Sequence, residues 1–360
     1  MSTRIGILTG GGDCPGLNTV IATVVTAAAK RGWETLGFID GYEGLINPVR
    51  CMVLPHSEME HVEYRGGTIL KTTNRGRFAA KVGQGQAVRV PEDLLDEAKS
   101  TVEYLGLKAL VCVGGDGSLS IAQQLFERGV PVVGVPKTID NDLDATAWTF
   151  GFDSAVACAT DALDRLRTTA ESHDRVMVLE VMGRYAGWIA LYAGMAGGAD
   201  AILIPEIPFS YDSVVDIVRA RERDGLTYTI VVVAEGARER GGDLVTDGSV
   251  QADREVRLGG IGARVSRELA QRTGRESRVV VLGHLQRGGS PTNFDRVLCS
   301  LYGTNAVELV AARTFGHMVA MHAWDIVSVP IAAAIGRLRT VPLDSAMIRS
   351  ARALGISLGD

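Results

Sequence analysis

Residues 4–18 read RIGILTGGGDCPGLN. The apolar run Arg4–Thr9 predicts a short strand, three glycines follow it, and an alanine- and valine-rich segment at residues 19–31 predicts a helix. A strand, a glycine loop and a helix start form the usual anion site of an α/β protein, because bare backbone N–H groups and a helix N-terminus point at one place. The spacing is neither G-x-G-x-x-G nor a Walker A sequence, so a tight turn is the alternative. The strand-to-helix context favours phosphate binding.

Two further segments of the first half follow the same pattern. Ala109–Val113 predicts a buried strand that ends in Gly114-Gly115-Asp116-Gly117-Ser118. Val130–Val135 predicts another, which ends in Pro136-Lys137-Thr138-Ile139-Asp140-Asn141-Asp142. The carboxyl ends of the strands in a doubly wound sheet line one crevice, where ligands bind. We therefore expect the three loops to lie together.

The acids of these loops are candidates for metal binding and catalysis. Asp116 lies beside a predicted phosphate site, and Mg²⁺ prefers one or two carboxylates together with phosphate oxygens; a helix cap is its alternative role. Asp140 and Asp142 are two residues apart, so an extended chain would point them the same way and a turn would fan them apart. Such a polar triplet is ordinarily a surface turn, but its position after a buried strand favours a functional role.

Other features of the first half are less specific. Residues 34–39 predict a strand, and residues 92–104 predict a helix. Residues 65–77, which include Arg75, are basic and rich in hydroxyl groups. In an acidic protein this stretch is a candidate anion clamp, and a solvated loop is an equally good interpretation.

The second half repeats the alternation of strands and helices. Strands are predicted at residues 175–181, 201–204, 229–234 and 278–282, and helices at residues 155–167, from 188, 211–223 and 264–272. The strands and their end loops carry the polar residues Arg184, Glu235, Arg278, His284 and Arg287. Arginine forks suit a phosphate monoester and glutamate suits sugar hydroxyls, whereas a lone arginine or histidine is ordinarily solvated or structural. The tail predicts two helical segments and one strand, residues 326–330.

The composition limits the class of protein. A chain of 360 residues suits two domains, and 46% hydrophobic with 22% charged residues is ordinary globular composition. A net charge of −5 argues against nucleic acid as a general partner. The five scattered cysteines predict a reducing cytosol and no disulfide frame or zinc site. We expect no signal peptide and no membrane span.

Taken in order, these motifs resemble the bacterial A-type 6-phosphofructokinase family. The segments that carry the resemblance are Gly11-Gly12-Asp13, Gly115-Asp116-Gly117-Ser118, residues 136–142, Met182-Gly183-Arg184 and residues 283–289, and the match covers roughly the first 335 residues. The resemblance implies two Rossmann-like three-layer α/β domains with mostly parallel sheets. Residues 1–151 plus 286–335 would bind ATP and Mg²⁺, and residues 152–285 plus 336–360 would bind fructose 6-phosphate.

The resemblance also implies a reaction and a set of roles. A phosphoryl group is transferred to the 1-hydroxyl of fructose 6-phosphate, a cytoplasmic step of glycolysis. Asp140 is the implied base, with Thr138, Gly11 and Arg184 beside it in the catalytic group, and Asp116 and Asp142 are the implied Mg²⁺ ligands. The residues implied to bind the donor phosphates are Gly11, Arg75, Gly115, Asp116, Gly117, Ser118 and Lys137. The residues implied to bind the sugar phosphate are Thr138, Asp140, Asp142, Met182, Gly183, Arg184, Glu235, His284 and Arg287.

Two more arginines imply self-association. Arg175 and Arg278 match family arginines that reach the 6-phosphate across a subunit interface. The resemblance therefore implies a homo-oligomer, a tetramer or a dimer, whose sites are completed by a neighbouring copy.

Two positions that report the phosphoryl donor in this family disagree. Gly117 is the ATP-type residue, because glycine leaves room for the α-phosphate. Lys137 is the pyrophosphate-type residue, because its ammonium can reach the phosphates of the smaller donor. We favour ATP, since Gly117 removes an obstruction and either donor tolerates an added cation. Pyrophosphate is the alternative, and an ADP-linked donor stays open.

Two rival functions are weaker. A lipid- or NAD-kinase-like enzyme also uses a G-G-D-G segment, but residues 283–289 and Met182-Gly183-Arg184 have no place in it. A non-catalytic nucleotide or sugar-phosphate sensor would be favoured by loss of Asp116 or Asp140, and both are present. An NAD dehydrogenase is disfavoured, because the first glycine loop lacks the dinucleotide spacing.

Overall fold

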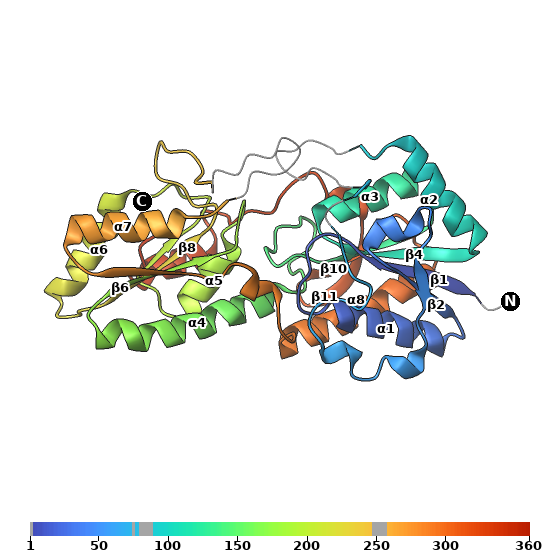
Figure 1. Ribbon diagram of the computed structural model, residues 1–360, viewed down its shortest axis with the longest axis horizontal. Helices are drawn as coiled ribbons and strands as arrows, with labels where there is room; N and C mark the ends of the chain where they lie inside the picture. Colours follow the sequence, from blue (N-terminus) through green and yellow to red (C-terminus); the bar gives the residue numbers. More distant parts are fainter. Residues whose placement is uncertain (1–2, 74–75, 79–88, 247–257) are drawn as a thin grey trace. The chain divides into compact units, whose positions relative to one another are not determined.

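A computed structural model describes residues 3–73, 76–78, 89–246 and 258–360. The chain forms two compact units. Unit 1 comprises Met1–Ser154 and Arg287–Leu338, and unit 2 comprises Ala155–Gln286 and Arg339–Asp360. Each unit is a sheet with helices on both faces (Figure 1), so the predicted three-layer α/β architecture is confirmed. Which ligand each unit binds stays a prediction at this point.

Unit 1 is built on a seven-stranded sheet in the order β11-β10-β5-β4-β1-β2-β3. Its strands are β1 (Arg4–Thr9), β2 (Glu34–Phe38), β3 (Cys51–Val53), β4 (Leu107–Gly114), β5 (Val132–Pro136), β10 (His317–His322) and β11 (Asp325–Pro330). The two edge strands, β3 and β11, are antiparallel to their neighbours, and the other pairs are parallel. Because β1, β4 and β5 are neighbours, their carboxyl ends and the loops that follow lie at one edge, as predicted.

The helices of unit 1 cover both faces of this sheet. α1 (Leu17–Lys30) and α8 (Asn293–Ala311) lie on one face, and α2 (Glu92–Tyr104) and α3 (Asp116–Glu127) lie on the other (Figure 1). A short helix, α9 (Ile331–Ala334), follows β11.

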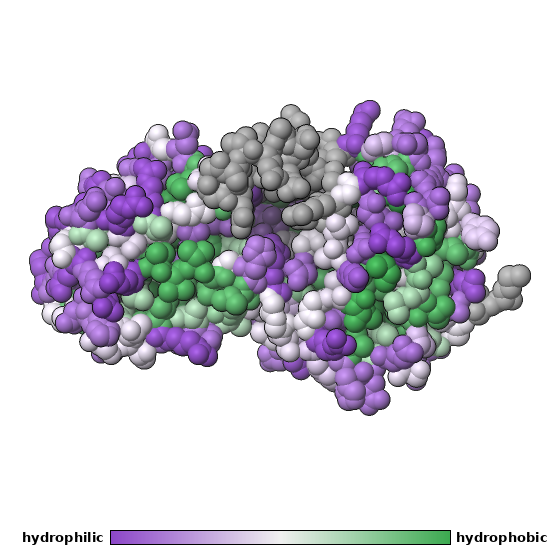
Figure 2. Space-filling view, viewed as in Figure 1, coloured by the Kyte–Doolittle hydropathy of each residue, from purple (hydrophilic) through white to green (hydrophobic). Residues whose placement is uncertain are grey.

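Unit 2 is built on a four-stranded parallel sheet in the order β7-β8-β6-β9. Its strands are β6 (Val176–Val181), β7 (Ala201–Leu203), β8 (Thr229–Ala234) and β9 (Ser277–Val281), and its helices are α4 (Phe152–Ser172), α5 (Trp188–Ala196), α6 (Tyr211–Arg223), α7 (Ile261–Thr273) and α10 (Ala346–Ala353). α4 begins three residues before the boundary at Ala155. Hydrophobic residues gather on the visible face of this unit over the sheet (Figure 2), and Val281 of the edge strand β9 is 54% exposed.

Two strands were not predicted. β3 has three exposed residues and pairs only with β2, and β10 follows α8 in the tail and pairs with both β5 and β11. Both depend on tertiary pairing at the side of the sheet, which a short local pattern does not signal. None of the helices in the described ranges is long and apolar enough to cross a membrane.

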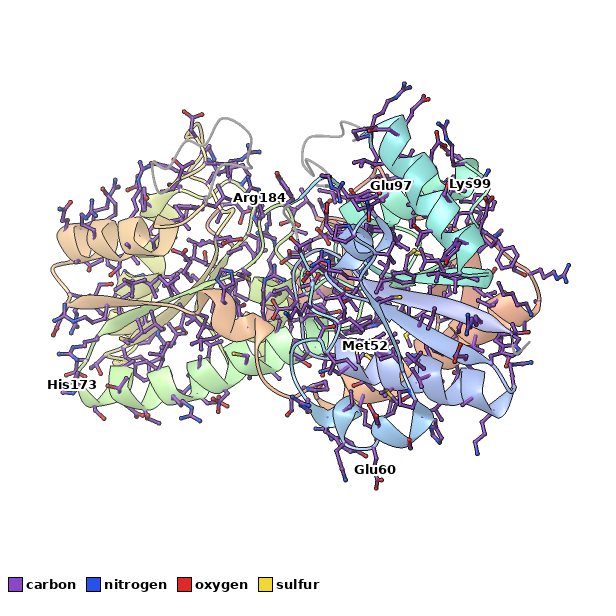
Figure 3. All side chains as sticks on the ribbon, turned by 45° about the vertical axis from the view of Figure 1, so that its right-hand side comes forward. Met52, Glu60, Glu97, Lys99, His173 and Arg184 are labelled. Atoms are coloured by element: carbon purple, nitrogen blue, oxygen red, sulfur yellow. The ribbon has the colours of Figure 1, made fainter. Side chains whose placement is uncertain are left out.

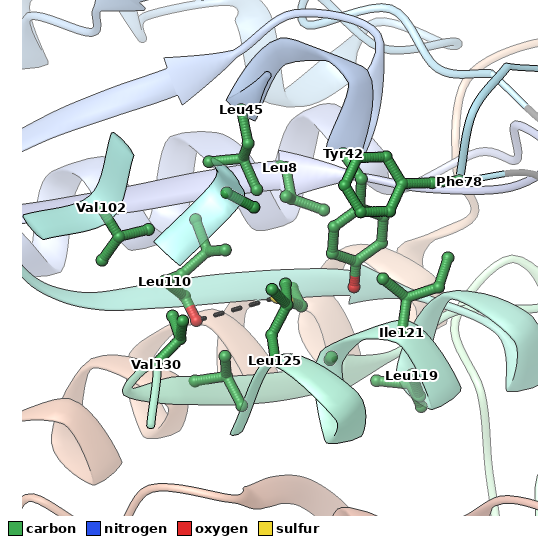
Figure 4. Close-up of a cluster of buried hydrophobic side chains, with 14 of the residues drawn as sticks. Leu8, Tyr42, Leu45, Phe78, Val102, Leu110, Leu119, Ile121, Leu125 and Val130 are labelled. Atoms are coloured by element: carbon green, nitrogen blue, oxygen red, sulfur yellow. Dashed lines mark hydrogen bonds between the residues drawn. The ribbon is translucent and has the colours of Figure 1, made fainter. Parts of the chain in front are cut away.

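The apolar core of unit 1 holds in place the carboxyl edge of the sheet, where the candidate loops lie. Leu8 of β1, Leu110 of β4 and Leu125 of α3 are fully buried in one apolar cluster (Figure 4). Burial of each such leucine stabilises the fold by ~1.5–3 kcal/mol. Tyr42 belongs to the same cluster, and its hydroxyl donates a 2.6 Å hydrogen bond to the carbonyl of Ser118. The cluster therefore ties the start of α3 to the loop after β2.

Candidate active site

The glycine loop after β1 and the glycine loop after β4 pack directly on each other. The Gly10 N–H donates to the carbonyl of Val113 at 2.9 Å, which joins the ends of β1 and β4. A Cβ on Gly10 would lie 2.5 Å from Ser118 Oγ, and a Cβ on Gly114 would lie 2.2 Å from Ser118 Cβ. Glycine is required at both positions because Ser118 occupies the space that their side chains would need. Thr72 completes the first loop, since its hydroxyl donates to the Gly11 carbonyl at 2.6 Å.

Asp116 stands at the start of α3, and Gly115 is the N-cap of that helix. The suggested cap role of Asp116 is therefore wrong. Its Oδ1 instead accepts a 3.1 Å hydrogen bond from the N–H of Gly336. Burial raises the pKa of Asp116, and the hydrogen bond from Gly336 partly offsets this. The carboxylate is therefore poorly solvated, which favours a cationic partner.

A tight turn after β5 holds Asp140 and Asp142. The Thr138 hydroxyl donates to Asp142 Oδ1 at 3.1 Å and accepts from the Asp140 N–H at 3.2 Å. Between the two acids, Asn141 has a left-handed backbone with φ of 51°. Its side-chain Oδ1 accepts from the Thr149 N–H at 3.0 Å, and Asn141 is buried. The turn is therefore braced from behind, and its two acids do not follow an extended chain.

The charges of this turn influence one another. The pKa of Asp142 is raised to about 7, first by burial and then by the nearby charge of Asp140, with a smaller contribution from Asp116. The hydrogen bond from Thr138 partly lowers it. The charges of Asp140 and Asp116 thus both act on Asp142, an arrangement that a divalent cation would relieve.

Lys137 and Arg287 both bind carbonyls of the first glycine loop. The buried Lys137 ammonium donates to the Gly12 carbonyl, and burial lowers its pKa. Arg287 Nη1 donates to the Asp13 carbonyl at 3.2 Å. Both cations lie in unit 1. The structure therefore places Arg287 against this loop, and Arg184 and Glu235, with which the sequence grouped it, belong to the other unit. Arg75 lies outside the described residues.

A second group of predicted residues gathers at the carboxyl edge of the unit 2 sheet. Met182, Gly183 and Arg184 follow β6, Glu235 follows β8, and His284 follows β9. The Glu235 N–H donates to the Val181 carbonyl at 2.8 Å, and the Gly236 N–H donates to the Gly183 carbonyl at 3.1 Å. A Cβ on Gly236 would lie 1.9 Å from the Arg184 carbonyl oxygen, so only glycine allows these two loops to touch.

Two residues of the quoted motifs were not assigned to a site, and a third residue, Glu276, was not singled out. Gln286 is fully buried, and its Oε1 accepts from the Met182 N–H at 3.3 Å while its Nε2 donates to the Gly283 carbonyl at 3.1 Å. Asn141 and Gln286 play similar parts, because each is a buried amide that fixes a loop bearing predicted site residues. Glu276, which precedes β9, pairs with both Arg175 and Arg278.

Arg175 and Arg278 lie at the other edge of this sheet. Arg175 directly precedes β6 and Arg278 is the second residue of β9, so both are at the amino ends of parallel strands. Figure 3 shows His173, two residues before Arg175, at the opposite end of unit 2 from Arg184. A strand of six residues spans ~20 Å. One chain therefore does not bring these two arginines together with Arg184, Glu235 and His284.

The whole chain is similar to known proteins. A family model described as phosphofructokinase matches residues 4–310. The chain belongs to the phosphofructokinase family. It is 53% identical over 358 residues to the ATP-dependent 6-phosphofructokinase of Chloroflexus aurantiacus, a match that covers 99% of this chain and 98% of that relative.

Phosphofructokinase-family relatives with another donor in their name are also similar. The chain is 49% identical over 342 residues to the pyrophosphate–fructose 6-phosphate 1-phosphotransferase of Amycolatopsis methanolica, covering 94% of this chain and 96% of that relative. The solved phosphofructokinase of Saccharomyces cerevisiae superposes with a TM-score of 0.78 at 28% identity and covers 92% of this chain. The chain spans 45% of the length of that yeast chain.

The acids of this phosphofructokinase-family member fit a magnesium ion better than a protein-only metal cage. Within the described ranges, there is no cluster of three or more histidine, cysteine, aspartate or glutamate side chains placed to hold a metal. Asp116 and Asp142 are both poorly solvated carboxylates, and the charge of Asp116 contributes to the raised pKa of Asp142. Mg²⁺ typically uses one or two carboxylates and takes its other ligands from water and substrate phosphates. The donor set is thus suited to a metal that arrives with a phosphate donor.

Proposed function

We propose that the chain transfers a phosphoryl group from ATP to the 1-hydroxyl of D-fructose 6-phosphate, giving fructose 1,6-bisphosphate in glycolysis. The observation that carries the proposal is the braced turn at residues 138–142, which follows β5 at the edge where both glycine loops also end. Membership of the phosphofructokinase family and the full-length similarity to an ATP-dependent 6-phosphofructokinase support the reaction. A cytoplasmic location is proposed from the five scattered cysteines, a pattern typical of proteins in a reducing compartment.

Asp140 is the base of the proposed reaction. As the sugar oxygen bonds to the transferred phosphorus, the hydroxyl proton passes to the Asp140 carboxylate and the bond to the leaving ADP breaks. Phosphoryl transfer depends on alignment and charge neutralisation, so a correctly placed carboxylate is sufficient as the base. The Thr138 hydroxyl, held between the Asp140 N–H and Asp142 Oδ1, orients the turn toward the reacting group. Asp116 and Asp142 would hold Mg²⁺, which neutralises charge on the donor phosphates when bound.

The donor phosphates bind the glycine loops in this proposal. Gly11 and the loop Gly115–Ser118 supply backbone N–H groups, and the start of α3 adds a favourable dipole. Arg75 would add a cation. Lys137, whose ammonium donates to the Gly12 carbonyl, would brace the first loop and add a cation beside the donor phosphates.

The sugar phosphate binds unit 2 in this proposal. Met182, Gly183, Arg184, Glu235 and His284 would bind it from the carboxyl edge, together with Arg287 of unit 1. Arg175 and Arg278 would come from a second copy of the chain, so the proposed enzyme is a homo-oligomer, a tetramer or a dimer. The placement of these arginines at the amino edge and the exposed apolar surface near β9 support self-association.

A pyrophosphate-dependent reaction is the second candidate. Lys137 and the similarity to the Amycolatopsis enzyme favour it. A coupled assay of the purified chain with fructose 6-phosphate, Mg²⁺ and either ATP or pyrophosphate separates the two. We expect turnover with ATP, and substantial turnover with pyrophosphate alone would overturn the choice of donor. Thermal stabilisation by ATP and fructose 6-phosphate without turnover would instead indicate a sensor.

A further inference from the structure

Glu276 lies between two arginines at the amino edge of the unit 2 sheet. Its Oε2 is 2.9 Å from Arg175 Nε, and its Oε1 is 2.5 Å from Arg278 Nη2. Each carboxylate oxygen of Glu276 thus contacts one guanidinium group. A single side chain therefore sets the spacing between two cations that come from different strands.

The backbone fixes the positions of these three residues. The Val176 N–H donates to the Glu276 carbonyl at 3.0 Å, which joins the starts of β6 and β9. In the parallel pairing that follows, Val176 lies opposite Ser277 and Met177 lies opposite Arg278. The three Cα positions are consequently set by the sheet, and only the long side chains need further ordering.

The chemistry of the pair is that of a phosphate clamp. Two guanidinium groups that converge on one anion can bind phosphate oxygens with several N–H groups each. The Glu276 contacts engage one nitrogen of each arginine and leave the other donors available in this cluster. The side chains of Arg175 and Arg278 are 26% and 61% exposed, so both can be approached from solvent.

Glu276 has two opposing effects on such a clamp. It repels an incoming phosphate, but its own side chain is 41% exposed and water screens that repulsion. It also orders the two arginine side chains and offsets the repulsion between their charges. Because ordering long side chains is a substantial part of the free-energy cost of binding a ligand, arginines that are already ordered bind it more tightly. The pKa of Glu276 is lowered, chiefly by its close contact with the Arg175 guanidinium, so the carboxylate is ionised at neutral pH. The two effects predict opposite changes in substrate binding when the charge of Glu276 is removed.

We propose that Glu276 is a positioning residue that holds Arg175 and Arg278 at the spacing required to bind the phosphate of the sugar phosphate. The inference rests on the proposed function, because that function makes these arginines ligands of the substrate of a neighbouring copy. It adds a residue that touches no substrate and acts only through the two guanidinium groups.

The test is the steady-state kinetics of Glu276→Gln in the intact oligomer. Glutamine keeps the size but loses the charge, so we expect the KM for fructose 6-phosphate to rise about 5- to 20-fold and kcat to change less than about twofold. Glu276→Asp, which keeps the charge on a shorter arm, should recover part of the loss. Glu268→Gln is the matched control, since Glu268 pairs with Arg272 on α7 and leaves the clamp intact. A KM that is unchanged or lowered in Glu276→Gln would overturn the inference.

A double-mutant cycle separates positioning from a general loss of folding. The Arg278→Ala variant lacks one of the two guanidinium groups that Glu276 positions. In that background, the fold-increase in KM caused by Glu276→Gln should be at least about threefold smaller than in the wild type. Equal effects in both backgrounds would contradict the inference. If the wild type shows no turnover, the proposed function fails, and calorimetric binding of fructose 6-phosphate decides the inference separately. Weaker binding by Glu276→Gln than by the wild type would then support it, and equal binding would overturn it.

Discussion

Arg175 and Arg184 lie at opposite ends of β6, one directly before the strand and the other three residues after it. Six residues of strand separate them by ~20 Å, which is longer than one sugar phosphate. Both are proposed to bind the same substrate. That requirement is met only when the two arginines come from different copies of the chain. The length of β6 is therefore the reason to expect binding sites that are shared between two copies.

Mixed oligomers test shared sites directly. Arg175→Ala and Arg184→Ala should each lose most activity alone. When the two variants exchange subunits, a dimer of one of each has one doubly altered site and one unaltered site, so random mixing should restore about a quarter of wild-type activity. Activity is measured before and after mixing, and native mass spectrometry verifies exchange. Mixing each variant with itself is the control, and complete exchange without recovery would contradict shared sites.

Asp140→Asn tests the base. Asparagine preserves shape but takes up no proton, so we expect kcat to fall by about 10²- to 10⁴-fold, with little change in the KM for fructose 6-phosphate. The matched control is Asp144→Asn in the same segment, where the carboxylate accepts the Ala145 N–H and lies near Arg337. Turnover of Asp140→Asn near that of the control would exclude Asp140 as the base.

Gly117→Asp tests the donor. An aspartate one residue after the start of α3 would repel and obstruct the α-phosphate of ATP, which pyrophosphate lacks. We expect kcat/KM for ATP to fall at least about tenfold, and any activity with pyrophosphate to fall less. Gly117→Ala, which adds bulk without charge, distinguishes repulsion from crowding. An equal loss with both donors would mean that Gly117 does not select between them.

The sequence predicted the site of unit 1 better than that of unit 2. A strand that ends in glycines or acids signals the carboxyl edge, and the neighbouring order of β1, β4 and β5 brings those loops together. In unit 2, Arg278 was grouped with Arg184 because both lie on predicted strands or their end loops. Arg278 opens its predicted strand whereas Arg184 follows one, so their placement at opposite edges was available in the sequence.

The remaining differences depend on contacts between distant parts of the chain. Arg287 binds the carbonyl of Asp13, far away in the sequence, and no local pattern predicts that contact. Asn141 and Gln286 were quoted in the motifs, but an amide that binds backbone is indistinguishable from a solvated one until its burial is known. The same holds for Glu276, whose role depends on the pairing of β9 with β6.

A buried acid outside the proposed chemistry, Asp295 of unit 1, contacts the first residues of α4, which also lie in unit 1. Asp295 is in the first turn of α8, and its Oδ2 accepts from the Ser154 N–H at 2.9 Å and the Ser154 hydroxyl at 2.6 Å. The Thr292 hydroxyl, the N-cap of α8, donates to Asp153 Oδ2 at 2.6 Å. Asp295 thus caps the start of α4, whereas α8 is capped by its own Thr292. Burial raises the pKa of Asp295 from 3.8 to about 6, which its hydrogen bonds with Ser154 partly offset.

The raised pKa of Asp295 predicts the direction of a pH effect on stability. The folded state holds the proton more tightly than the unfolded state, so ionisation costs stability as pH rises from about 4 to about 6. The cost is at most about 3 kcal/mol. Asp295→Asn removes it, so the free energy of unfolding of the variant relative to wild type should increase between pH 4.5 and pH 7.5. Urea unfolding at both pH values measures this change, and Asp164→Asn, an exposed acid on α4, should show none. A difference between Asp295→Asn and wild type that stays constant with pH would mean that Asp295 titrates alike in both states.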